Sequence, residues 1–162
     1  MLEHSSLRLH GWSRVGAAWQ RTVTDVQGNV LGTIRFPPVA PSWFSWFVRP
    51  RLEILETADN AHLMTMVRVW GFQRGWNVLD ADEIFVGTVY PRSIISADGY
   101  EIARPQQHDI VASEKQVILL RHATNPASEL EMTFSGDTMR NPFVRMLLLA
   151  SVVSLDATPN QG

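Results

Sequence analysis

The sequence contains no cysteine, which excludes disulfides, thiolate nucleophiles, cysteine-based metal sites and S-acylation. Lysine is scarce too, because 13 of the 14 basic residues are arginine and Lys115 is the one lysine. The planar guanidinium of arginine suits phosphate and carboxylate recognition, although a genome rich in arginine codons explains the same bias. Net charge is −2 at pH 7, so no overall field attracts nucleic acid, and any attraction to phosphate requires a local patch.

Catalytic and metal-binding motifs are missing as well. No Gly-x-Ser-x-Gly elbow, phosphate-cradling glycine loop or dinucleotide fingerprint occurs in the sequence. The five histidines lack the His-x-His and His-Glu-x-x-His spacings of metal sites. We therefore expect a non-enzymatic protein without a cofactor. Residues 1–6 lack the basic start and apolar run of a signal peptide, which predicts a cytoplasmic protein, with the inner membrane face as the place of any peripheral attachment.

What the chain does contain is one long apolar segment near its C-terminus, residues 142–155. Asn141 can cap a helix, and Pro142 suits the first helical position, where no N–H is needed. One arginine, Arg145, and two serines interrupt the apolar residues. A helix that is apolar on every side is either buried in a core or spans a membrane, and this one rises only about 20 Å. We expect a buried helix; the alternative is a membrane-spanning Phe143–Leu155, which its length and Arg145 disfavour.

Between about residue 19 and residue 134 the sequence has the pattern of an antiparallel meander. Short runs rich in β-formers alternate with turn residues such as Gln27-Gly28-Asn29. In Leu130–Phe134, apolar and polar residues alternate, which predicts one buried and one exposed face. Residues 1–14 are polar and mixed, so we expect a loose lead-in there and a tail over 157–162. The expected strands are Gln20–Val26, Val30–Phe36, Arg51–Glu56, Leu63–Trp70, Gly75–Leu79, Ile84–Tyr90, Ser93–Ser96, Tyr100–Ala103, Asp109–Ala112, Gln116–His122 and Glu129–Phe134.

A weak internal repeat supports the meander. Residues 23–34 recur 55 residues later as residues 78–89, with Val, Asp and a Gly-Thr-aliphatic exit at matching positions. Two related hairpins placed around one axis favour a closed sheet, because closure removes exposed strand edges. The interior of such a sheet must be filled, and the apolar helix is the element thick enough to fill it. The helix residues expected at the centre are Phe143, Met146, Leu147, Leu149, Ala150 and Val153.

Residues 36–50 form the most unusual segment, because four prolines bracket four large aromatic residues. This composition predicts a stiff connection between the first two hairpins and not a strand. Aromatic rings next to arginines are typical of sites at a membrane interface. The rings either pack over an opening of the sheet or contact lipid, and lipid contact is the functional alternative. The candidate lipid contacts are Trp43, Phe44, Trp46, Phe47, Arg49 and Arg51.

Several segments together resemble the tubby C-terminal-like superfamily, and within it the phospholipid scramblase and LURP-one-related branch. The resemblance covers roughly residues 19–156 and implies a mainly β fold: a closed antiparallel β-barrel of about twelve strands around a central hydrophobic C-terminal helix, in one domain over 1–162. It also implies a phospholipid scramblase-like protein that binds lipid or a membrane surface, with membrane phospholipids as partners. A cytosolic binding or scaffold module of the LURP-one-related type, without scrambling activity, is the alternative. The matching segments are Asp25-Val26-Gln27-Gly28, Val30–Ile34, Arg49–Ile54, Trp76–Asp80, Val86–Val89 and Asn141–Met146.

Scramblase relatives are associated with calcium-stimulated lipid mixing, and their proposed calcium segment precedes the last helix. The equivalent stretch here, residues 133–141, has Asp137 as its one carboxylate, with Asn141 and hydroxyl groups nearby. Calcium takes six to eight oxygen ligands with several carboxylates among them. We therefore expect no calcium site, and Asp137 and Asn141 are the weak candidate ligands.

Overall fold

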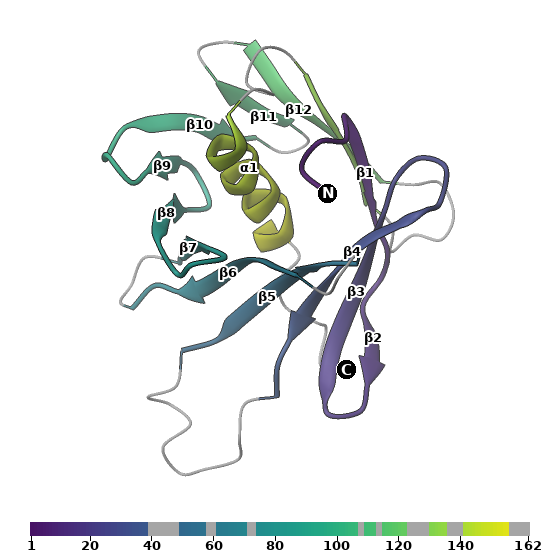
Figure 1. The fold of residues 1–162 in the computed structure, drawn as a ribbon. Coiled ribbons are helices and arrows are strands. Elements are labelled where there is room, and N and C mark those ends of the chain that lie inside the picture. Colours follow the sequence, from purple (N-terminus) through teal and green to yellow (C-terminus); the bar gives the residue numbers. More distant parts are fainter. Residues whose placement is uncertain are drawn as a thin grey trace.

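The computed structural model describes residues 1–38, 49–57, 61–70, 74–106, 109–112, 115–122, 130–135 and 141–155. Within these ranges, thirteen strands form one antiparallel sheet, and a single helix follows the last strand (Figure 1). The fold is therefore mainly β with a C-terminal helix, as predicted. The elements are β1 (Ser6–Leu9), β2 (Ser13–Val15), β3 (Ala18–Thr24), β4 (Val30–Phe36), β5 (Arg51–Glu56), β6 (His62–Arg68), β7 (Trp76–Asp80), β8 (Phe85–Val89), β9 (Ile94–Ser96), β10 (Glu101–Pro105), β11 (Asp109–Ala112), β12 (Lys115–His122), β13 (Leu130–Phe134) and α1 (Pro142–Leu155).

The sheet is a meander from β2 to β13, in which each strand pairs with the next one along the chain. β1 departs from this order, because its residues 6–9 pair with residues 130–133 of β13. β1 also pairs with β3, where Arg8 lies opposite Thr24 and Leu9 opposite Val23. The first strand thus connects the beginning of the meander with its end.

The prediction of a loose lead-in over residues 1–14 is wrong, because these residues include β1 and the start of β2. Leu7 and Leu9 alternate with polar neighbours and are fully buried. A strand of four residues is too short for its alternation to stand out in the sequence. Its partners in β13 also lie more than a hundred residues away, so only the folded chain brings them together.

α1 begins at Pro142 and ends at Leu155, as predicted, and its central part is enclosed on every side. The nine consecutive residues Arg145–Val153 are all buried, and nine residues make about two and a half helical turns. No direction around this stretch faces solvent. The helix packs against β7, β8 and β9, and the sheet curves around it (Figure 1).

One residue expected at the centre of the molecule lies elsewhere. Phe143 is 52% exposed, because it belongs to the first turn of α1, ahead of the enclosed stretch. The other expected central residues are buried: Met146, Leu147, Leu149, Ala150 and Val153.

The internal repeat is confirmed by the pairing of the strands. Val23 lies opposite Gly32 in the β3–β4 hairpin, and Val78 lies opposite Gly87 in the β7–β8 hairpin. In both hairpins a shift of register follows at the next residue. Sequence positions that match at a separation of 55 residues therefore occupy equivalent places in two hairpins of one sheet.

The turns of the two hairpins match in their hydrogen bonds as well. The Oδ1 atom of Asp25 accepts the backbone N–H of Asn29 at 2.8 Å, and the Oδ1 atom of Asp80 accepts that of Ile84 at 2.9 Å. In each turn the residue before this donor has a positive φ: Gly28 at 90° and Glu83 at 62°. Aspartate recurs here because its side chain satisfies turn N–H groups.

Candidate functional site

The structure describes two of the six candidate lipid contacts. Trp43, Phe44, Trp46 and Phe47 lie outside the described residues. Arg49 is exposed, and its guanidinium lies 5.7 Å from the ring centroid of Trp70, in cation–π contact. Trp70 is itself 54% exposed, so an accessible ring and a cation stand side by side next to the predicted aromatic segment.

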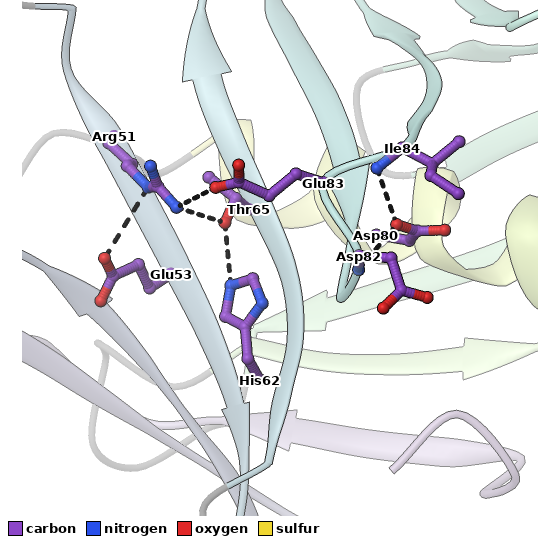
Figure 2. A network of polar contacts seen from close by, with 8 residues as sticks. All are labelled: Arg51, Glu53, His62, Thr65, Asp80, Asp82, Glu83 and Ile84. Atoms are coloured by element: carbon purple, nitrogen blue, oxygen red, sulfur yellow. Dashed lines mark hydrogen bonds and ion pairs between the residues drawn. The ribbon is translucent and has the colours of Figure 1, made fainter.

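Arg51 is held by other side chains on the outer surface of the sheet (Figure 2). Its guanidinium lies 3.2 Å from a Glu83 carboxylate oxygen, and its Nε lies 3.7 Å from Glu53. It also donates to the Thr65 hydroxyl at 3.3 Å, and this hydroxyl is 2.8 Å from the His62 ring. Arg51 therefore joins β5 to the β7–β8 turn, and its charge is partly neutralised by two carboxylates.

Arg145 is enclosed near the start of α1: it is 5% exposed. Its Nη2 donates to the backbone carbonyl of His4, and its guanidinium stacks 4.8 Å from the Phe134 ring centroid. Burial lowers the pKa of Arg145, and the negative charge of Glu3 opposes this effect. The carbonyl and the ring hold a buried cation, so Arg145 joins the N-terminal segment to the helix.

The structure describes one of the two weak calcium candidates. Asn141 caps α1, because its Oδ1 accepts the backbone N–H of Phe143 at 3.0 Å and that of Val144 at 3.4 Å. Asp137 lies outside the described residues. Within the described ranges, no three His, Asp or Glu side chains are grouped as metal ligands.

The charges of the connecting segments differ between the two ends of the sheet. Successive connections of an antiparallel meander lie at alternate ends. We call one end the arginine end: by sequence its connections, residues 16–17, 37–50, 69–75, 90–93, 106–108 and 123–129, contain three arginines and one carboxylate, Glu129. We call the other the carboxylate end: by sequence residues 25–29, 57–61, 81–84, 97–100 and 113–114 contain six Asp or Glu and no Arg or Lys. The three arginines are Arg49, Arg74 and Arg92, all of them exposed.

Turn chemistry accounts for two carboxylates of the carboxylate end. Asp25 and Asp80 accept backbone N–H groups of their own turns. Arginine has no comparable role in a turn, so the three exposed arginines at the other end need a different explanation.

Tryptophan gathers at the arginine end too. Trp19 lies at the start of β3 opposite Phe36, and Trp76 opens β7 beneath the Arg68 guanidinium at 5.4 Å. Trp70 follows the end of β6. By sequence, Trp43 and Trp46 fall in the β4–β5 connection, at positions outside the described residues. Tryptophan and arginine together are characteristic of protein surfaces that contact the lipid headgroup region.

In comparisons with known proteins, no family model, no curated protein and no solved structure matches the chain. The tubby-like resemblance therefore rests on the sequence segments quoted above. α1, the one helix among the described residues, falls short of the length and apolar content that a bilayer crossing requires.

Sequence reasoning found Arg49 and missed Arg74, Arg92 and Trp70 as its companions. These residues are 21 to 43 positions away from Arg49, so no local motif joins them to it. The grouping could have been found by counting the predicted hairpins along the chain, because every second connection of a meander lies at the same end of the sheet.

Proposed function

We propose that this protein is a non-enzymatic, phospholipid scramblase-like protein that binds an anionic membrane surface through its arginine end. The observation that supports this is the separation of charge between the two ends, with three exposed arginines and the exposed Trp70 at one and most of the turn carboxylates at the other. Such a molecule approaches an anionic surface with one end first, because the carboxylate end is repelled. Attachment would be peripheral, at the inner face of a membrane, and requires neither calcium nor another cofactor.

We propose further that the sheet is the closed, plugged barrel of a tubby-like domain. The pairing of β1 with both β13 and β3 supports closure, since it joins the two ends of the meander. The burial of α1 in all directions supports it as well, because an open sheet leaves one side of a packed helix uncovered.

Co-sedimentation with lipid vesicles tests membrane binding. The wild-type protein should bind vesicles that contain phosphatidylserine and remain in solution with pure phosphatidylcholine, and added salt should weaken the binding. Replacing Arg49, Arg74 and Arg92 with Gln should lower the partition coefficient roughly a hundredfold, because each cation near an anionic surface contributes about 1 kcal/mol.

A matched control distinguishes the effect of where a charge lies from the effect of net charge on vesicle binding. Replacing Asp82, Glu83 and Asp98 with Asn or Gln changes the net charge by three units in the opposite direction, at the carboxylate end. These substitutions should alter vesicle binding much less than the arginine substitutions do. Equal and opposite effects of the two triple variants would show that only net charge matters and would contradict the proposed orientation.

The aromatic segment is tested with the double substitution of Trp43 and Trp46 by Ala. Loss of binding would assign these rings to the lipid contact, whereas full retention would leave the arginines and Trp70 as the contact. Leaflet exchange in reconstituted vesicles, with and without calcium, tests the scramblase-like activity separately. Binding without exchange would favour surface attachment alone, and the absence of both would favour the cytosolic binding module.

A further inference from the structure

An apolar pocket of about 310 Å³ lies at the carboxylate end, between the first turns of α1 and the β7–β8 and β9–β10 turns. Val86 and Leu147 in its wall are almost fully buried. Its volume is at the lower limit of small-ligand pockets, which hold roughly 300–1,000 Å³. At roughly 30 Å³ for each water, this pocket has room for a molecule of about ten non-hydrogen atoms.

Large apolar side chains surround this pocket and remain exposed. Ile84 is 62% exposed, Phe143 52% and Phe85 43%, and all three line it. They come from two distant parts of the chain, the β7–β8 hairpin and the start of α1. Exposed rings and a branched side chain that gather around a hollow mark a surface that a ligand can cover.

The charge of the pocket is negative. Asp80 and Asp98 line it, and none of its described lining residues is Arg, Lys or His. An anionic ligand such as a fatty acid would meet repulsion from both carboxylates, whereas a cation would be attracted. The pocket therefore combines an apolar wall with carboxylates, a pairing that suits an apolar body with a positively charged end.

Comparison of the two repeats indicates that the Oδ2 atom of Asp80 lacks the hydrogen-bond donor that its counterpart in Asp25 has. In the first hairpin, Asp25 uses both carboxylate oxygens, because its Oδ2 accepts the side-chain amide of Asn29 at 2.8 Å. In the second hairpin Ile84 stands where Asn29 stands in the first, and it has no amide. The turn bonds of Asp80 both go to Oδ1. The exchange of Asn for Ile at this repeat position thus leaves Oδ2 without that donor and adds apolar surface beside it.

We infer that this pocket binds a small amphiphile with a protonated amine: a short alkyl chain enters between Leu147, Val86 and Phe85, and the ammonium group lies beside Asp80 and Asp98. This site is at the end opposite the proposed membrane contact and does not depend on it. Titration with octylammonium, octanoate and 1-octanol, all of one chain length, tests the inference by calorimetry and by amide chemical shifts of the pocket residues. Octylammonium should bind about tenfold more tightly than octanoate, with octanol between them.

Two substitutions separate the apolar from the charged part of the site. Asp98→Asn should reduce the preference for octylammonium over octanoate about threefold and leave octanol unchanged. Phe85→Ser should weaken all three ligands about tenfold, because it removes an apolar wall. Val30→Ser is the matched control: Val30 is the repeat counterpart of Phe85, is 49% exposed and does not line the pocket.

Each unfavourable result contradicts a definite part of the inference. Equal affinity for octylammonium and octanoate would exclude the role of the carboxylates. Equal loss of binding in Phe85→Ser and Val30→Ser, or shifts away from the pocket, would show that the chain binds elsewhere. Absence of binding by all three ligands to the folded protein would exclude the pocket as a site for alkyl chains of this length.

Discussion

Glu83 is the one non-glycine residue with a positive φ among the described residues. The repeat indicates that this position of the turn favours glycine. The equivalent residue in the first hairpin is Gly28. A side chain in the left-handed region has an energetic cost of about 1–2 kcal/mol, and asparagine tolerates this region better than glutamate. The ion pair of Glu83 with Arg51 is exposed and compensates only a small part.

Glu83→Asn should therefore raise the free energy of unfolding by about 0.5 kcal/mol, as measured by urea denaturation. The reverse change in the other hairpin, Gly28→Ala, should lower it by about 1 kcal/mol. No atom lies within 4 Å of a Cβ built on Gly28, so backbone conformation alone is responsible for this loss. A destabilised Glu83→Asn variant would show that the contact with Arg51 outweighs the backbone strain.

Asp25 is expected to make stability depend on acid pH. The hydrogen bond from the Asn29 side chain, together with backbone donors, lowers the pKa of its carboxyl below the ordinary value. A carboxyl whose pKa falls on folding stabilises the folded state at pH values above its unfolded pKa, which is about 3.9. This contribution is lost as the pH falls from about 4 through the lower pKa of the folded state.

Asp25→Asn should therefore flatten the pH dependence of the urea midpoint below pH 4, while the wild-type protein loses stability there. Asp82→Asn is a suitable control, because Asp82 is an exposed turn residue whose carboxylate makes no recorded contact in the described structure. The same flattening in both variants would show that general charge repulsion, and not the Asn29 contact, controls the acid response.

At the scale of elements, each hairpin of the repeat has a glycine outside its turn, Gly32 or Gly87, where the neighbouring strand passes very close. A Cβ on Gly32 would lie closer than 3.0 Å to the Leu55 carbonyl oxygen of β5, and a Cβ on Gly87 would similarly approach the Ile95 carbonyl of β9. In both places the next strand passes too close for any side chain. The Gly-Thr-aliphatic exit of the repeat is thus a packing requirement between neighbouring strands.

Gly32→Ala and Gly87→Ala should each lower the free energy of unfolding by about 3 kcal/mol or more, because a backbone group must move to admit the methyl group. Gly16→Ala is the control, since its Cβ would meet nothing within 4 Å and only its φ of 61° is unfavourable. Its cost should stay near 1 kcal/mol. Thermal and urea unfolding of the three variants would measure the difference, and similar losses in all three would exclude the close approach as the cause.

At the scale of the whole molecule, the enclosed helix determines stability. The backbone amides of residues 146–153 should exchange with deuterium only through global unfolding, because protein surrounds this stretch. Leu149→Ala should lower the free energy of unfolding by about 2–5 kcal/mol. Leu155→Ala, at a residue that is 52% exposed on the same helix, should change it by less than about 0.5 kcal/mol. Rapid exchange throughout the helix would contradict the enclosure.

The whole molecule also has two chemically different ends, and this is the scale at which its function is proposed. The arginine end carries exposed arginines and the exposed Trp70, while the carboxylate end carries an apolar pocket lined by Asp80 and Asp98. A protein attached through the first end leaves the second exposed to the aqueous phase, where a small amphiphile can reach it.

The sequence by itself determined the elements that depend on local patterns. The bounds of α1 follow from Asn141, Pro142 and a predominantly apolar run, and β5 and β11 begin and end at the predicted residues. Capping, alternation and turn residues act within a few positions, so they can be read along the chain. The repeat was also visible in the sequence, because turn aspartates and close-approach glycines are required at the same spacing in both hairpins.

Only the tertiary structure decided what depends on contacts between distant segments. β1 forms because β13 and β3 provide its hydrogen-bonding partners. The burial of Arg145 depends on the His4 carbonyl and the Phe134 ring. The pocket likewise needs Phe85 and Phe143, which are 58 residues apart, to meet at one end of the sheet. Hydrogen bonding and burial between such segments arise from the course of the whole chain, and no local sequence pattern encodes them.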